Sequence, residues 1–208
     1  FEQAAIAIFV AMVLDGLDGR VARLTRTQSA FGAEYDSLSD MVSFGVAPAL
    51  VTYAWALKDM GRLGWIASFI YCVGAALRFA RFNSSAEASD KRFFQGLPSP
   101  AAAALVAGFV WVMIDRGAQG ADVRWLAGAL VIFAGITMVS NVRFYSFKDF
   151  NLRRSVPFVF IVAIALIIAL LSYEPSLALF GLFVVYALSG YVLALRRLLR
   201  RKATSSAD

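Results

Sequence analysis

Residues 15–40 read DGLDGRVARLTRTQSAFGAEYDSLSD, and this charged stretch joins two long apolar runs, 1–18 and 36–57. A helix needs an apolar run of about 20 residues to cross a hydrocarbon core about 30 Å thick. The polar residues 23–30 between the two runs predict a turn, so the two helices are expected to run antiparallel. The chain therefore begins as a helical hairpin in a membrane.

The rest of the chain has the same apolar character. Of its 208 residues, 60% are hydrophobic, and its mean hydropathy of +0.70 lies far above that of soluble domains. The runs are continuous and rich in small residues, which argues against the short alternating strands of a β-barrel. We predict an all-α polytopic transmembrane bundle of seven helices, forming a single domain over 1–208. The five further apolar runs are 63–82, 97–115, 123–142, 155–173 and 175–197.

The basic residues lie in loops and at helix ends, so their distribution predicts the membrane topology. The net charge of +6 therefore does not indicate nucleic-acid binding. If the first helix ends in the cytoplasm, 16 of the 20 basic residues lie on that side, as the positive-inside rule requires. We expect a multi-pass protein of the cytoplasmic membrane with its active site facing the cytoplasm. The basic tail 196–202 is expected to contact membrane lipids, either as a simple interface anchor or by holding anionic headgroups.

The sequence contains no histidine and a single cysteine, Cys72. These two facts exclude an imidazole base, a disulfide framework and a cysteine-based zinc site. Acid–base chemistry and metal binding therefore depend on the carboxylates.

Four aspartates adjoin or lie within the first two apolar runs, where an ion is costly to place. Asp15 and Asp18 are three residues apart, and Asp36 and Asp40 are four apart, so each pair shares a helix face. We predict that the four carboxylates converge and bind one or two hard divalent ions, Mg²⁺ or Mn²⁺, with Ca²⁺ as an ion that a structure could also hold. The alternative is that these acids form ordinary interfacial ion pairs with the three arginines Arg20, Arg23 and Arg26.

The spacing Asp15-x-x-Asp18-Gly19-x-x-Ala22-Arg23, eight residues, Gly32-x-x-x-Asp36-x-x-x-Asp40 resembles the signature of the CDP-alcohol phosphotransferases at every fixed position. In that family an alcohol attacks the β-phosphate of a CDP-linked donor, CMP leaves, and a divalent metal is required. The resemblance implies that all four aspartates bind metal and that Asp40 also serves as the general base.

The same resemblance implies a donor site beside these acids. Arg23 would contact the donor's phosphates together with Asp15, while Gly19 and Ala22 would leave space for the cytidine. Gly19 and Gly32 lack a Cβ, so a nucleotide could approach the backbone closely there. A helix-packing role for either glycine is equally compatible with the sequence.

Four further stretches resemble the phosphatidylserine synthase branch of this family: 40–49, 78–83, 96–101 and 141–149. This resemblance implies CDP-diacylglycerol as donor and L-serine as acceptor. Serine brings a carboxylate and an ammonium, so its pocket needs a cation beside hydrogen-bonding groups. The candidates for serine binding are Ser43, Arg78, Arg81 and Asn83.

The sequence leaves several alternative interpretations open. Each arginine could instead be a snorkelling interface anchor, although Arg78 lies one turn inside Arg81 and is the better candidate for a ligand. Another acceptor, such as glycerol 3-phosphate or an inositol phosphate, would fit the same signature. A membrane prenyltransferase and an ion-coupled transporter are alternatives from other classes. The family also has a membrane helix before the signature helix, so we expect eight helices in the full-length protein, and we expect a homodimer.

Overall fold

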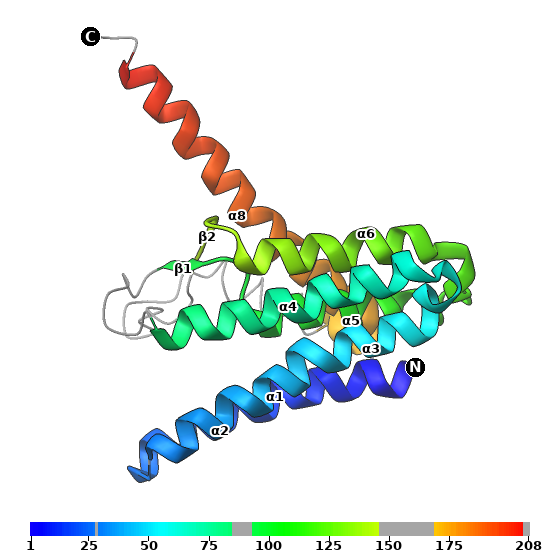
Figure 1. The fold of residues 1–208 in the computed structure, drawn as a ribbon, viewed down its shortest axis with the longest axis horizontal. Coiled ribbons are helices and arrows are strands. Elements are labelled where there is room, and N and C mark those ends of the chain that lie inside the picture. The colour runs from blue at the N-terminus through cyan, green and yellow to red at the C-terminus, as the bar shows by residue number, and fades with distance from the viewer. Residues whose placement is uncertain (28, 85–92, 146–168, 206–208) are drawn as a thin grey trace.

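The computed structural model describes residues 1–27, 29–84, 93–145 and 169–205, and these are almost entirely helical (Figure 1). The all-α membrane bundle is therefore confirmed, apart from one pair of three-residue strands that the sequence did not predict. In that pair β1 (Phe93–Gln95) runs antiparallel to β2 (Arg143–Tyr145). The α-helices are α1 (Glu2–Thr25), α2 (Ala30–Asp40), α3 (Ala47–Thr52), α4 (Arg62–Ser84), α5 (Ser99–Asp115), α6 (Gly120–Val139) and α8 (Pro175–Ser205).

The second predicted helix is longer than the apolar run suggested. It extends without a break from α2 through α3 to Met60. It begins at Ala30 because the side chain of Ser29 accepts a hydrogen bond from the Gly32 N–H at 3.0 Å, which caps the first turn. Within this stretch the structure has π-helical turns at Met41–Val46 (η1) and Tyr53–Leu57 (η2), and a final 3₁₀ turn at Lys58–Met60 (η3).

Among the described residues, four helices are long and apolar enough to cross a membrane: Ala30–Met60, Arg62–Ser84, Gly120–Val139 and Pro175–Arg196. Helix α1 is outside this set because its first 18 residues include the acids Glu2, Asp15 and Asp18. Helix α5 is apolar but has only 17 residues. The predicted run 155–173 falls mostly outside the described residues, and its last part, 169–173, is helical. The chain is a membrane protein.

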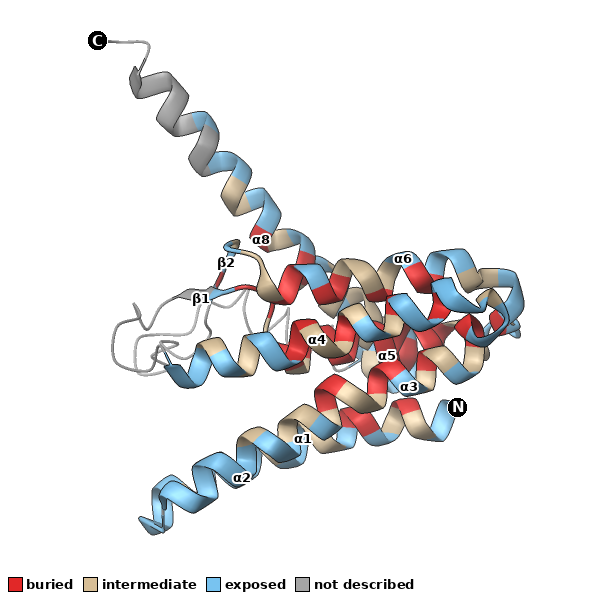
Figure 2. Cartoon of the chain, in the orientation of Figure 1, coloured by how far each residue is buried: buried red, intermediate tan, exposed pale blue. Residues whose placement is uncertain are grey.

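Helix α5 lies at the centre of the bundle, and 12 of its 17 residues are buried. Buried residues are concentrated where α5 meets its neighbours, whereas the parts of α1 and α2 nearest their connecting turn are mostly exposed (Figure 2). In a membrane these exposed apolar surfaces can face lipid, since a lipid environment does not penalise apolar side chains.

Helices α4 and α6 approach each other most closely at two glycines. A Cβ added to Gly74 would lie 2.5 Å from the Gly135 carbonyl oxygen, and one added to Gly135 would lie 2.9 Å from the Tyr71 Cα. Only glycine permits this backbone contact, as the small residues of these runs predicted.

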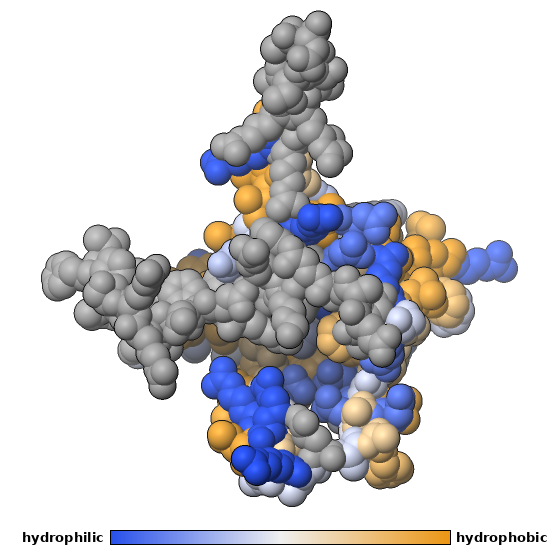
Figure 3. Space-filling view, turned by 90° about the vertical axis from the view of Figure 1, so that its left-hand side faces the viewer, coloured by the Kyte–Doolittle hydropathy of each residue, from blue (hydrophilic) through white to orange (hydrophobic). Residues whose placement is uncertain are grey.

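In the described part of the chain, the charged hairpin turn and the charged end of α4 lie at one end of the bundle. Helices α1 and α2 run in opposite directions, and the turn between them lies at the same end as the last residues of α4 and the β1–β2 pair (Figure 1). Figure 3 looks onto this end, where hydrophilic side chains gather. At the other end, Arg116 and Glu174 form an ion pair of 3.0 Å between exposed side chains.

Candidate functional site

Three of the four predicted aspartates form one group. Asp15 comes from α1, and Asp36 and Asp40 come from consecutive turns of α2. One carboxylate oxygen from each lies within 4.8 Å of the others. Asp15 and Asp40 are half-buried, whereas Asp36 is exposed. An ion held by all three would lie at the edge of the hairpin, open to a substrate.

The local sequence explains why these acids meet. Helix α1 ends because Arg26 adopts a left-handed conformation with φ of 56°, and its N–H bonds back to the Ala22 carbonyl. Ser29 then starts α2 in the opposite direction. The four-residue spacing of Asp36 and Asp40 turns both toward Asp15.

Asp18 lies outside this group, although the sequence predicted four converging carboxylates. It is exposed and one turn nearer the end of α1 than Asp15. The structure therefore brings together three of the four predicted ligands.

The ion-pair alternative finds no support in the described part of the chain, where none of the three acids has an arginine or lysine partner. Arg23 instead donates from its Nε to the Gly19 carbonyl oxygen at 2.8 Å. Three carboxylates this close repel one another unless a cation lies among them. Their all-oxygen chemistry fits a hard divalent ion.

The two glycines of the signature do not pack against any other helix in the described ranges of the chain. A Cβ added to Gly19 would meet no atom within 4 Å, and one added to Gly32 would meet only the Ser29 hydroxyl at 3.0 Å. Ala22 is half-buried on the same helix as Gly19. Among the residues that the structure describes, the helix-packing alternative therefore finds no partner for either glycine.

Arg78 of α4 lies near the acidic group, with Asp40 and Tyr186 as its electrostatic neighbours. Its Nη1 donates to the hydroxyl of Ser99 at 2.8 Å. Its Nε is shielded from solvent and has no hydrogen-bond partner in the described part of the chain. A half-buried guanidinium with a shielded, unpartnered Nε in the described part of the chain is unusual for an interface anchor.

The other predicted serine-binding residues have different surroundings. Arg81 donates to the Val139 carbonyl oxygen at 3.1 Å and to the Asn141 side chain at 3.5 Å, which ties α4 to the end of α6. Asn83 donates to the Ser37 hydroxyl at 3.3 Å. Ser43 is half-buried in η1, three residues after Asp40. They lie at the same end of the bundle as Arg78.

The π-helical turn η1 directly follows Asp40. Pro48 has no N–H, so the Phe44 carbonyl lacks its usual α-helical donor. The hydroxyl of Tyr71, a fully buried residue of α4, donates to this carbonyl at 2.9 Å. This contact fixes the acid-bearing helix against α4, which carries Arg78.

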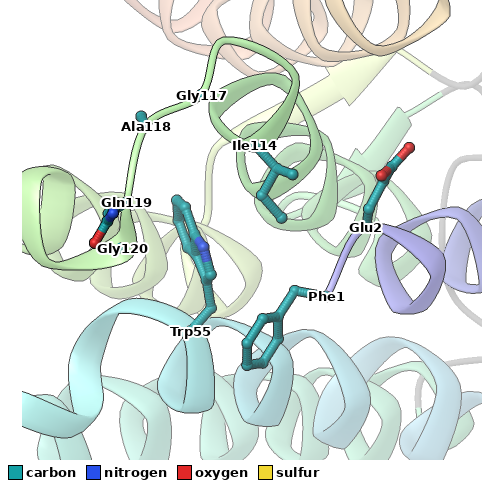
Figure 4. Close-up of a pocket in the computed structure, with 8 residues that line it drawn as sticks. All are labelled: Phe1, Glu2, Trp55, Ile114, Gly117, Ala118, Gln119 and Gly120. Atoms are coloured by element: carbon teal, nitrogen blue, oxygen red, sulfur yellow. The ribbon is translucent and has the colours of Figure 1, made fainter.

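A cavity of about 520 Å³ lies at the opposite end of the bundle, and Phe1, Trp55 and Ile114 face it (Figure 4). Glu2 also lines it, and Asp15 lies 13 residues farther along α1, about 20 Å away at 1.5 Å per residue. The cavity is therefore separate from the acidic group.

Sequence reasoning missed the residues that contact the predicted side chains. Ser99 lies in the stretch 96–101, whose pattern was noted but given no role. Ser37 lies between Asp36 and Asp40 at a variable position of the signature, and Tyr186 lies in α8. No local pattern marks these residues, because their contacts join distant parts of the chain.

Comparison with known proteins shows which family the chain resembles over most of its length. A model of the family described as CDP-alcohol phosphatidyltransferase matches residues 1–140. Over 211 residues the chain is 37% identical to a CDP-diacylglycerol–serine O-phosphatidyltransferase of Helicobacter pylori, covering 99% of this chain and 86% of that protein. A protein of the same name from Methanocaldococcus jannaschii is 35% identical over 189 residues, covering 91% and 83%. One from Saccharomyces cerevisiae is 39% identical over 117 residues, covering 53% and 42%.

Proposed function

Since this chain belongs to the CDP-alcohol phosphatidyltransferase family, we propose that it transfers the phosphatidyl group of CDP-diacylglycerol to the hydroxyl of L-serine and releases CMP. The observation that carries this proposal is the position of the half-buried cation Arg78, whose Nε is shielded from solvent, in the neighbourhood of Asp40. Arg78 would hold the carboxylate of the acceptor, and Asp40 would take the proton of the acceptor's hydroxyl.

The acidic group fits a divalent cation, because its possible ligands are all carboxylate oxygens and its acids form no ion pair in the described part of the chain. Asp15, Asp36 and Asp40 would hold a first Mg²⁺ or Mn²⁺, which when bound would neutralise charge on the phosphoryl oxygens. Asp18 lies one turn from Asp15 on the same helix, so it is the remaining carboxylate for a second ion.

The donor would lie along the exposed side of α1. Gly19 offers open space for the nucleotide, and the neighbouring Ala22 has only a methyl group. The guanidinium of Arg23, now on the Gly19 carbonyl, has further N–H groups for the phosphates. Gly32 lies in the first turn of α2, where the absence of a Cβ would let the donor approach the backbone.

Asp40 would act as the general base. A carboxylate oxygen of Asp40 takes the proton from the serine hydroxyl while the serine hydroxyl oxygen attacks the β-phosphorus of the donor. The bond from this phosphorus to the CMP oxygen breaks, and CMP leaves. Asp40 suits this role because it is half-buried and is the acid nearest along the chain to Ser43, another candidate for binding serine.

Purified protein in mixed micelles tests the reaction. With CDP-diacylglycerol and Mn²⁺ or Mg²⁺, we expect CMP release on adding L-serine and a phosphatidylserine product by mass spectrometry. Glycerol 3-phosphate and inositol phosphate serve as alternative acceptors, and a chelator should abolish release until metal is restored. Turnover only with another alcohol, or undiminished turnover without metal, would contradict the proposal.

The active site would face the cytoplasm. Arg20, Arg23, Arg26, Arg78 and Arg81 lie toward the hairpin end, whereas Lys58, Arg62, Arg116 and Arg124 lie toward the other end. This is the charge asymmetry of a protein whose hairpin end stays in the cytoplasm. We expect the membrane to be the cytoplasmic membrane.

Cysteine labelling tests this orientation. In a Cys72→Ala background, Thr27→Cys should react with a membrane-impermeant maleimide in inverted vesicles but not in intact cells. Asp59→Cys, on the exposed η3 turn at the other end, is the matched control and should react in intact cells. The reverse pattern would place the site outside the cytoplasm.

The single domain over 1–208 and the homodimer stay predictions. Native mass spectrometry of the detergent-solubilised protein tests the second, with a mass of twice the 22.6 kDa chain as the expected result.

A further inference from the structure

Arg78 is held by a residue that has no other evident task. Its Nη1 donates to the Ser99 hydroxyl at 2.8 Å, and Ser99 is fully buried. Ser99 is the first residue of α5, and the N-cap residue before it is Pro98. No side-chain hydrogen bond caps the start of this helix. The Ser99 hydroxyl is therefore not needed to start the helix.

We infer that Ser99 is a positioning residue, which holds Arg78 so that the Nε edge of its guanidinium is free to bind the carboxylate of the acceptor serine. The inference rests on the proposed function and names the atoms that would select an amino acid as acceptor.

The backbone before Ser99 is fixed by hydrogen bonds. The N–H of Gly96 donates to the Val142 carbonyl at 2.8 Å, and that of Leu97 donates to the Thr137 carbonyl at 3.1 Å. Gly96 has a φ of +76°, and a Cβ there would collide with the Met138 carbonyl oxygen. Because this segment is held against the end of α6, the Ser99 oxygen is a fixed acceptor.

The remaining edge of Arg78 has the geometry of a carboxylate receptor. A guanidinium presents five N–H groups in a rigid plane, and Nε with its neighbouring Nη2 forms a two-donor edge that matches a carboxylate. Nη1 is used by Ser99, while Nε is buried without a partner in the described part of the chain. A buried donor left without a partner is costly, so a ligand that bonds to Nε gains that free energy back.

Serine fits this edge in both charge and length. Its carboxylate and hydroxyl are separated by only two carbon atoms, so a carboxylate on Arg78 leaves the hydroxyl in the neighbourhood of Asp40. An alcohol without a carboxylate or phosphate would leave the Nε donor unpaired. Fixing the guanidinium in advance also lowers the conformational entropy lost when serine binds.

The test is Ser99→Ala in the full chain, with KM measured for serine and for CDP-diacylglycerol. We expect the serine KM to rise about 3- to 10-fold, the effect of one ordinary hydrogen bond, with donor KM and kcat unchanged. Ser99→Thr keeps a hydroxyl and should restore most of the serine affinity. Ser68→Ala is the matched control, since Ser68 is a serine of α4 whose buried hydroxyl has no hydrogen-bond partner among the described residues.

A double-mutant cycle shows whether Ser99 acts through Arg78. In an Arg78→Ala background, Ser99→Ala should have no further effect on the serine KM. The same fold-change in both backgrounds, or a fall in kcat with both KM values unchanged, would overturn the positioning role. An unchanged serine KM in Ser99→Ala together with a raised one in Arg78→Ala would overturn this inference alone. Absence of CMP release with serine in the unmodified protein would overturn the proposed function and the inference with it.

Discussion

Asp36→Asn and Asp40→Asn should each lower kcat by about 10²- to 10⁴-fold, while the protein still inserts and purifies. Asparagine has nearly the shape of aspartate but lacks its negative charge, and the charge is what a metal ion or a proton requires. The carboxylate oxygens of both residues lie within 4.8 Å of that of Asp15, so either change removes a charge from the centre of the group. CMP release from purified variants at saturating substrates measures the effect.

The two variants should differ in their response to metal. Asp36→Asn should require a higher Mn²⁺ concentration for half-maximal rate and should recover partly when metal is raised, because only a ligand is lost. Asp40→Asn should stay slow at any metal concentration, because the proposed base is lost as well. Asp59→Asn, an exposed acid at the other end of the same helical stretch, is the control and should keep full activity. Near-normal turnover in Asp36→Asn or Asp40→Asn would show that the acidic group is not the active site.

The acidic group was predictable because its parts are local. Helical spacing places Asp36 and Asp40 on one face, and one polar turn brings that face to Asp15. Asp18 lies outside this group, although its three-residue spacing from Asp15 places it on the same side of α1. Sequence spacing gives the face of a residue but not the angle between two helices.

The detail of the second helix was only partly predictable. Ser29 is a typical N-cap residue, yet it lay in what the sequence suggested was a polar turn. Pro48 marks a missing backbone donor, but the sequence does not show that Tyr71 supplies one from another helix. The hydrogen bond to the Phe44 carbonyl is a tertiary contact, which local sequence does not reveal.

The surroundings of Arg78 could not be predicted for the same reason. Ser99 lies 21 residues away along the chain, and Tyr186 lies in the last helix. The β1–β2 pairing likewise joins residues 93–95 to 143–145, and runs of three residues carry too little pattern to predict a strand. The stretch 96–101 was recognised by resemblance, but its contact with α4 through Ser99 is a tertiary feature that the sequence does not show.

Arg78→Ala should raise the KM for serine about 10- to 150-fold and change that for CDP-diacylglycerol much less. Loss of a hydrogen bond to a charged group typically costs roughly 1.5–3 kcal/mol, which corresponds to this range of affinity. Initial rates at varied serine and fixed saturating donor, and then the converse, separate the two constants. Arg62→Ala, an exposed arginine at the opposite end of α4, is the control and should leave both unchanged.

Arg78→Lys distinguishes a carboxylate receptor from a simple positive charge. A lysine ammonium keeps the charge near Asp40 but cannot offer two parallel N–H groups, so it should rescue the serine KM only in part. Full rescue by lysine would mean that charge alone is needed. If Arg78→Ala instead raised the KM for CDP-diacylglycerol and left the serine KM unchanged, Arg78 would belong to the phosphate site. If neither KM changed, Arg78 would be an interface anchor. Because Nε is buried and unpartnered in the described part of the chain, the first outcome, selective loss of serine affinity, is the one that we expect.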